Sequence, residues 1–410
     1  MTLTARTLGA AAALAAAAIA LTGCVAKATA DPAASFTVKS TADACTVSAD
    51  TAKSGTLTFD ISNSGDQVTE FYLLASDGLR IVGEVENIAP SASRTMTVVA
   101  QPGDYFTVCK PGMVGDGVGK SAFTVSGDKV AIDGPDAEQK QKAVDLYAAF
   151  VKDQVGQLVP AVQELVNAYQ SGDDAKAREL FPNTRAYYER IEPVAEALGD
   201  LDPRIDFREV DAVADGLDWT GFHRLEKDLW QPAQDALNSD GETSAWKDWA
   251  PSTPEQRGEF GDLLISDVQE LYDYVHSKDF TTALNDQGIA GISNGAVALL
   301  DEVATGKISG EEDWWSHTDL YDFAANVEGS KMAFSLVSDL VASKGADGKA
   351  LVEEISTGYA DLEKALAAQG SLEAGFVPFT QLNDADKREL IDLINALAEP
   401  LSKLTSTALA

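Results

Sequence analysis

The chain has 410 residues, and its 31 Lys and Arg residues against 65 Asp and Glu residues give a formal net charge of −34. Because a surface this negative repels phosphate backbones, the charge excludes a nucleic-acid partner. Only three histidines are present, which excludes a metal site built mainly from imidazoles. The composition, 45% hydrophobic and 23% charged, is typical of a globular protein, and the length predicts two or three domains at about 100–200 residues each.

The first residues have the features of an export signal. An Ala-rich apolar run over residues 8–21 is too short for a membrane span. The run ends in Leu21-Thr-Gly-Cys24, which resembles the bacterial lipobox, where cleavage leaves a lipid-modified cysteine as the new N-terminus. An ordinary secretory signal with a chance cysteine is the alternative. We predict a signal peptide over residues 1–23, lipidation at Cys24, a tether over 24–33 and a mature protein held outside the membrane by acyl chains.

Hydrophobic residues alternate with a period of two from residue 34 to residue 127. Short runs rich in β-branched and aromatic residues, such as residues 55–61 and 104–109, are separated by turn signals rich in Asn, Asp, Gly and Pro. About seven such runs in fewer than a hundred residues predict a small β-sandwich. Residues 128–137, which contain Gly and Pro, are expected to form a linker.

From residue 138 to residue 410 the period becomes helical. Val144, Tyr147, Val151 and Val155 begin a stripe with steps of three or four residues, and similar stripes recur later in the chain. This pattern predicts an all-α domain of roughly eight helices packed as bundles. Strands followed by helices, segregated along the chain, make a two-domain protein.

The first candidate for chemistry is a histidine and a glutamate in Gly221-Phe-His-Arg-Leu-Glu226. His223 and Glu226 are three residues apart, so on a helix both side chains project from the same face. A helical His and Glu pair facing a bundle interior can hold a metal ion. The structural alternative is a capping histidine beside a solvated glutamate.

Carboxylates before this motif are candidate ligands for a hard cation. Glu189 and Glu192 are also three residues apart, and Asp206, Glu209 and Asp211 follow in a predicted loop. A charged surface is the alternative for these residues. Brought together with one imidazole, the oxygens suit iron, manganese or zinc better than Cu⁺.

A third segment crowds acids and aromatic residues around a histidine, His317. Ser316 and Asp319 predict a capping box at the start of a helix, and Asp322 lies one turn further on the same face. We count Asp322 among the candidate metal ligands. The sequence contains no hydrolase triad, no H-E-x-x-H motif and no Gly-rich phosphate loop.

Two cysteines remain after the predicted lipidation site. In an exported protein, Cys45 and Cys109 are expected to form a disulfide. A soft-metal site is the alternative, and the residues alone leave both readings open.

Several segments together resemble a known family. Tyr188-Glu-Arg-Ile-Glu-Pro-Val-Ala195, Gly199-Asp-Leu-Asp-Pro-Arg-Ile-Asp206, Thr220-Gly-Phe-His-Arg-Leu-Glu-Lys-Asp-Leu-Trp230 and the stretch 307–329 occur in order. They resemble the imelysin, or peptidase-like, domain of the EfeO-type components of EfeUOB iron uptake systems. Segments such as Gln101-Pro-Gly-Asp-Tyr105 resemble the cupredoxin-like N-terminal domain of the same family.

The resemblance implies an extracytoplasmic iron-binding protein and not an enzyme. Such a protein would capture Fe²⁺ or Fe³⁺ and deliver it to a membrane permease, with a haem peroxidase as a further partner. Gly221, His223 and Glu226 match the metal motif of the family, and Glu189, Glu192 and Asp211 match acidic positions grouped with it. The lipobox departs from freely soluble relatives and indicates anchoring to the outer face of the cytoplasmic membrane.

The N-terminal domain departs from the family pattern, because Cys45 is followed by Thr-Val-Ser instead of a Cys-x-x-Glu-Pro-Met stretch. It also has no histidine, which rules out a blue-copper site. The possible ligands of a second site for copper or ferric iron are Cys45, Cys109, Glu70, Glu84 and Glu86.

Two other functions remain as alternatives. In a zinc peptidase, Glu226 would act as the general base, and an acid together with His317 would have to converge on His223. In a metal-free surface module, the sandwich would bind a protein or glycan and the helical domain would be a spacer.

Overall fold

The computed structural model describes residues 34–113, 115–305 and 307–410. The predicted signal peptide, the tether and the predicted lipidation site at Cys24 lie outside the described residues. Within the described ranges, no helix combines the length and the apolar character that a membrane span requires.

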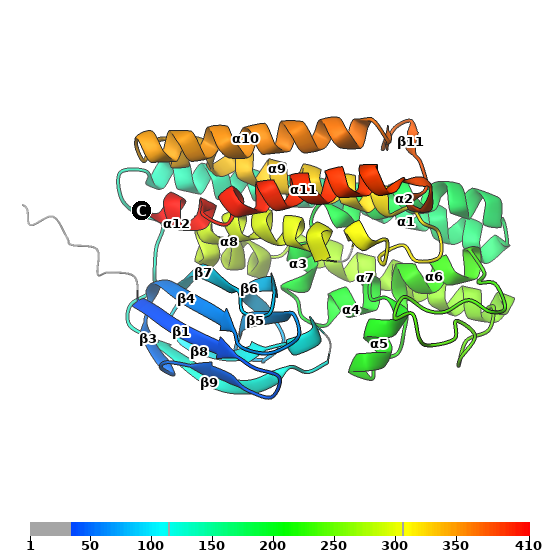
Figure 1. Cartoon of the computed structure of the whole chain (residues 1–410), viewed down its shortest axis with the longest axis horizontal. Coiled ribbons are helices and arrows are strands. Elements are labelled where there is room, and N and C mark those ends of the chain that lie inside the picture. The colour runs from blue at the N-terminus through cyan, green and yellow to red at the C-terminus, as the bar shows by residue number, and fades with distance from the viewer. Residues whose placement is uncertain (1–33, 114, 306) are drawn as a thin grey trace, which may run out of the picture. The chain divides into compact units, whose positions relative to one another are not determined.

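The N-terminal part is a β-sandwich of two sheets (Figure 1). One sheet has the strand order β2-β1-β4-β7 and the other has the order β3-β9-β8-β5-β6. The strands are β1 (Ala34–Ser40), β2 (Cys45–Val47), β3 (Thr51–Lys53), β4 (Gly55–Asn63), β5 (Thr69–Leu74), β6 (Ile81–Ile88), β7 (Ser93–Ala100), β8 (Gly103–Cys109) and β9 (Val118–Ser126). The described part therefore has nine strands here, where about seven were expected.

The two sheets enclose an aromatic core. Phe59 of β4 stacks on Phe36 of β1 with ring centroids 5.2 Å apart, and Phe71 and Phe123 complete the cluster. Cys45 of β2 and Cys109 of β8 form a disulfide, which links one sheet to the other. Of the two readings that the sequence left open for these cysteines, the structure therefore contains the disulfide.

The C-terminal part is helical. Among the described residues there are twelve α-helices, of which seven are at least 16 residues long, and one two-residue strand pair, β10 (Gly370–Ser371) with β11 (Gly375–Phe376). The helices are α1 (Ala137–Ser171), α2 (Asp174–Glu189), α3 (Glu192–Glu196), α4 (Leu201–Ile205), α5 (Glu209–Asp215), α6 (Gly221–Leu229), α7 (Pro254–Val275), α8 (Lys278–Thr305), α9 (Asp319–Ala342), α10 (Ala346–Ala367), α11 (Asp384–Leu401) and α12 (Leu404–Leu409). The predicted fold class, a β-sandwich followed by a helical domain, is confirmed.

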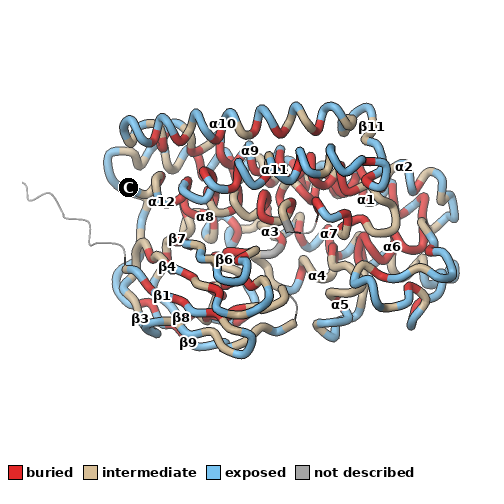
Figure 2. The backbone as a smooth tube through the Cα atoms, in the orientation of Figure 1, coloured by how far each residue is buried: buried red, intermediate tan, exposed pale blue. Residues whose placement is uncertain are grey.

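Amphipathic stripes direct the packing of the long helices. The predicted stripe on α1 is buried, and α10 buries Leu351, Ile355, Tyr359 and Leu362 while its other side is exposed (Figure 2). Helix α9 differs, because its first half is buried on nearly every side, polar residues included. Polar groups in such a position require buried partners, and these partners form the candidate site described below.

The sandwich contacts α8 through strands β6 and β7. The Asn294 side-chain amide donates to the Thr97 carbonyl at 2.9 Å, and Arg94 lies 3.8 Å from Asp301. Carboxyl groups also gather here. Burial raises the pKa of Glu84 on β6 to about 8, and the neighbouring charge of Glu302 on α8 adds to the effect.

This shifted pKa predicts that stability falls as pH rises. The Glu84 carboxyl has an ordinary pKa of 4.5 and one of about 8 in the fold, so the folded chain binds the proton more tightly, and stability is lost between these values. At about 1.4 kcal/mol per pKa unit the loss is at most about 4–5 kcal/mol, and it is smaller because the side chain keeps some solvent contact. We expect Glu84→Gln to raise the thermal unfolding midpoint at pH 8.5 and to leave it unchanged at pH 4.5. An equal shift at both pH values would contradict this.

Candidate metal centre

A glycine places the predicted His–Glu motif. Gly221 begins α6 with φ of 81°, and a Cβ built on it would lie 2.1 Å from the Ile205 carbonyl oxygen. Only glycine therefore permits the start of α6 to contact the end of α4. This close approach brings His223 next to Asp206, the residue that follows α4. Every residue of α6 is buried.

His223 and Glu226 contact each other within this helix. The His223 Nδ1 atom lies 3.0 Å from Glu226 Oε2, and Glu226 Oε1 accepts hydrogen bonds from the backbone N–H groups of Trp315 and Ser316 at 3.0 and 2.7 Å. His223 Nε2 has no hydrogen-bond partner among the described residues, although Glu312 Oε1 lies 3.4 Å away. A buried nitrogen without a partner beside carboxylates suits metal ligation.

Three overlapping groups of side chains have the geometry to hold a cation. In each group the potential ligand atoms lie within 4.8 Å of one another, and all residues are buried. The groups are His223 with Glu226 and Asp313, His223 with Asp206 and Glu312, and Glu189 with Glu192 and Asp206. Since His223 and Asp206 each belong to two groups, the three form one continuous centre.

Two buried cations lie among these carboxylates. Arg185 of α2 is inaccessible to solvent and contacts Glu189 at 2.5 Å, Glu312 at 3.1 Å and Asp206. Lys307, just after α8, lies 2.8 Å from both Glu189 and Glu192. The carboxylates of the centre outnumber these two cations, so a further positive charge would offset the excess of negative charge.

The excess of carboxyl groups over cations shifts the pKa values of the groups in the centre. Burial and Arg185 lower the pKa of His223, but the carboxylates of Glu226, Glu312 and Asp206 outweigh them and raise it to about 10. Burial raises the pKa of Asp206 to about 8 despite Arg185 and His223, and burial also raises the pKa of Asp322 well above its usual range. Without a metal ion, protons therefore supply part of the compensating charge.

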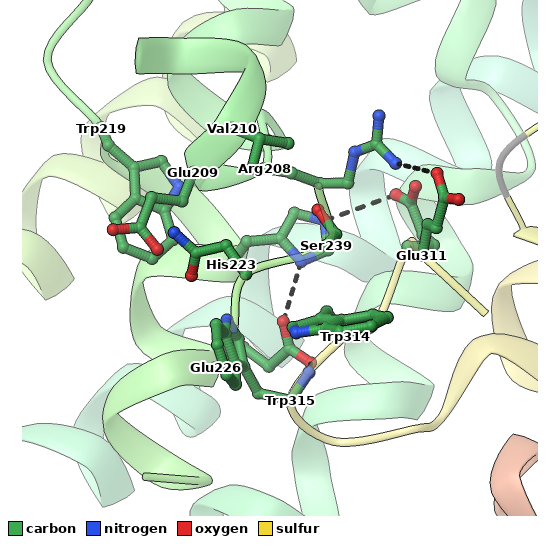
Figure 3. Close-up of a pocket in the computed structure, with 12 residues that line it drawn as sticks. Arg208, Glu209, Val210, Trp219, His223, Glu226, Ser239, Glu311, Trp314 and Trp315 are labelled. Carbon is green, nitrogen blue, oxygen red and sulfur yellow. Dashed lines mark hydrogen bonds and ion pairs between the residues drawn. The ribbon is translucent and has the colours of Figure 1, made fainter. Parts of the chain in front are cut away.

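A small pocket opens beside His223 (Figure 3). The residues that line it include His223 and Glu226, the tryptophans Trp314 and Trp315, and the ion pair of Arg208 with Glu311 (3.6 Å). Its volume of about 10 Å³ is the space of one water-sized sphere. This space admits a bare ion or a water molecule.

The structure brings together most of the predicted ligands. Glu189 at the end of α2 and Glu192 at the start of α3 lie in the centre, and Asp322 of α9 lies 3.4 Å from Arg185 Nε. Asp211 is the exception. It is half-buried on α5, binds Arg208 at 2.7 Å and belongs to none of the three groups found among the described residues.

The predicted second site in the sandwich lacks its sulfur ligands. Cys45 and Cys109 are joined to each other, so neither offers a thiolate. Glu70, Glu84 and Glu86 remain on β5 and β6, where the Tyr72 hydroxyl donates to Glu70 at 2.6 Å. None of the three cation-binding groups found among the described residues contains a sandwich residue.

Sequence reasoning missed several parts of the centre. Arg185 and Lys307 were not singled out, nor were Glu312 and Asp313, which precede α9. The predicted capping box is also wrong, because α9 follows Thr318 and Asp319 Oδ1 instead accepts a hydrogen bond from the Asp313 backbone N–H at 3.1 Å. A usable signal was the density of acids in Gly310-Glu-Glu-Asp313, directly before two tryptophans.

Comparison with known proteins agrees with this architecture. The imelysin family model matches residues 143–404, and the cupredoxin-like domain model matches residues 12–120. The protein is thus an imelysin-domain protein with a cupredoxin-like N-terminal part.

Full-length relatives narrow the class further. The chain is 35% identical to the iron uptake system component EfeO of Yersinia pestis, over 88% of this chain and 87% of the relative. It is 34% identical to EfeO of Escherichia coli O157:H7, over 86% of each chain. The chain belongs to the EfeO family of iron uptake system components.

Proposed function

We propose that this protein binds iron at the His223 centre outside the cytoplasmic membrane and delivers it to a permease of the same uptake system, with a haem peroxidase as a further partner. The lipobox-like segment supports a lipid anchor at Cys24 on the outer face of that membrane. The observation that carries the proposal is the buried centre itself. In it, His223 Nε2 has no hydrogen-bond partner among the described residues and faces the carboxylates of Glu312 and Asp206.

The ligand chemistry suits iron. One imidazole and several carboxylate oxygens are ligands that Fe²⁺ and Fe³⁺ accept, whereas Cu⁺ prefers sulfur. Binding would replace protons with a cation, because His223 and Asp206 must be deprotonated to act as ligands. The strongly negative chain would also raise the local concentration of cations.

A peptidase mechanism has less support. A catalytic zinc site in which His317 joins His223 would need both histidines in one group. Among the described residues, His223 is the one histidine in the three cation-binding groups. The relatives are named as iron uptake components, so we favour ion binding without catalysis.

Metal titration of a double variant tests the proposal. We expect His223→Ala/Glu226→Ala to weaken binding of Fe²⁺, measured anaerobically on metal-free protein by calorimetry, at least about 100-fold, because both an inner ligand and its hydrogen-bonded partner are lost. A matched control is His276→Ala, which removes an exposed histidine at the end of α7 that stacks on Tyr272. This control should bind as the natural protein does. Unchanged affinity in the double variant would refute the assignment.

A further inference from the structure

Lys307 lies among carboxylates that form one of the three cation-binding groups. Its side chain is inaccessible to solvent, and its Nζ atom lies 2.8 Å from Glu189 Oε2 and 2.8 Å from Glu192 Oε2. These two glutamates and Asp206 make up the one cation-binding group found among the described residues that lacks His223. The ammonium group therefore neutralises the oxygens that would bind a second ion.

We propose that Lys307 is a built-in cation that limits the centre to one metal ion, and that removing its charge opens a second metal site at Glu189, Glu192 and Asp206. This inference rests on the proposed function, because it concerns how many ions the same centre holds. The ligand class is a divalent cation that accepts oxygen ligands, such as Fe²⁺.

The charges favour this assignment. Two buried carboxylates without a cation would be strongly destabilised, and Lys307 is the cation that Glu189 and Glu192 share. Arg185 binds the other oxygen of Glu189 at 2.5 Å and also contacts Asp206. Glu189 and Asp206 would therefore keep one positive partner if Lys307 lost its charge. The site would then need one further cation.

Asn326 provides an independent observation that this position is suited to a ligand. Its Nδ2 donates to the Glu189 backbone carbonyl at 2.8 Å, and also to Glu189 Oε2 at 3.3 Å and to Glu192 Oε2 at 3.2 Å, beside Lys307. Its Oδ1 is buried and has no hydrogen-bond partner among the described residues. Rotation of the amide by half a turn would give up these bonds and present Oδ1 to a metal ion that replaces the ammonium group.

The sharing of Asp206 explains why one lysine can set the stoichiometry. Asp206 belongs to the group around Lys307 and also to a group that contains His223. Two ions would therefore be bridged by one carboxylate, as in two-metal sites. With the ammonium group in place, the two groups that remain both use the His223 ring. A neutral imidazole has one acceptor nitrogen, so the ring holds one ion.

The test counts metal ions per chain. The full chain and its variants are dialysed anaerobically against Fe²⁺, and bound iron is measured by mass spectrometry. We expect one equivalent for the natural protein and for Lys307→Arg, which keeps the charge, and two equivalents for Lys307→Met. Adding Glu192→Gln to Lys307→Met should return the count to one.

The outcomes separate this inference from the proposed function. No bound iron in the natural protein would overturn the proposed function and this inference with it. One equivalent in both the natural protein and a folded Lys307→Met would overturn this inference alone, and so would two equivalents in the natural protein.

Folding is checked by thermal unfolding with and without Fe²⁺, and Lys307→Gln serves as a second uncharged variant. Recovery of a folded state with two equivalents of Fe²⁺ would support the inference. If both uncharged variants stay unfolded even with Fe²⁺, the lysine is a structural residue and the inference fails.

Discussion

Arg185→Met is expected to lower the free energy of unfolding of the metal-free protein by about 3–5 kcal/mol. The guanidinium is fully buried and contacts Glu189 and Glu312 within 3.1 Å, so its removal leaves buried carboxylates without their cation. Asp313 and Asp322 lie 3.5 and 3.4 Å from its Nε atom and would lose the same partner. Denaturant unfolding in the presence of a chelator measures the change.

The matched control is Arg185→Lys, which keeps the charge and loses the planar fork that reaches several carboxylates at once. We expect an intermediate loss of stability for this variant. Added Fe²⁺ should recover part of the stability of Arg185→Met, because a bound cation replaces some of the missing charge. A change of less than about 1 kcal/mol in Arg185→Met would contradict the view that the carboxylates depend on this cation.

Gly221→Ala is expected to weaken metal binding and to lower stability by more than about 2 kcal/mol. The left-handed backbone alone costs about 1–2 kcal/mol for a residue with a Cβ, and here the Cβ would also lie 2.1 Å from the Ile205 carbonyl oxygen. The start of α6 must therefore move away from α4. His223 would then separate from Asp206, and Fe²⁺ affinity should fall by about 100-fold, as measured by calorimetry.

Gly216→Ala separates the two causes. Gly216 ends α5 with φ of 70°, and a Cβ there would have no atom within 4 Å. This control carries the backbone strain without the collision, so we expect a loss of about 1–2 kcal/mol and unchanged Fe²⁺ affinity. Equal binding defects in the two variants would show that the contact of α6 with α4 does not position the site.

Local patterns were sufficient to predict the two kinds of architecture. The alternation in the first part and the stripe beginning at Val144 depend on which side of one element is buried. The hydrophobic period within that single segment is enough to predict this. The spacing of His223 and Glu226 on one helical face is local in the same way. The three-residue strands β2 and β3 escaped prediction because so short a run carries no measurable period.

The rest of the centre depends on contacts between distant segments. Arg185 and Lys307 are 122 positions apart in the numbering, and in sequence each is an ordinary cation of the kind that is usually solvated. Only the folded chain shows that both contact Glu189. Asp211 stays a predicted ligand, and only the folded chain shows that its carboxylate binds the neighbouring Arg208.

The cysteine pair shows a different limit. The sequence allowed a disulfide or a metal site, because two cysteines can form either one. Export of the chain favours the disulfide. The two residues are 64 positions apart, and the folded sandwich places their Cα atoms 5.4 Å from each other. This distance is typical of a disulfide, and it follows from the packing of the two sheets.

The most direct test of the central claim is an anomalous difference map from crystals loaded with Fe²⁺, measured on both sides of the iron absorption edge. We expect one strong peak in contact with the His223 ring and its neighbouring carboxylates, and no such peak in the His223→Ala/Glu226→Ala variant. A peak confined to Glu70, Glu84 and Glu86 in the sandwich, or the same peak in the variant, would contradict the assignment of iron binding to the His223 centre.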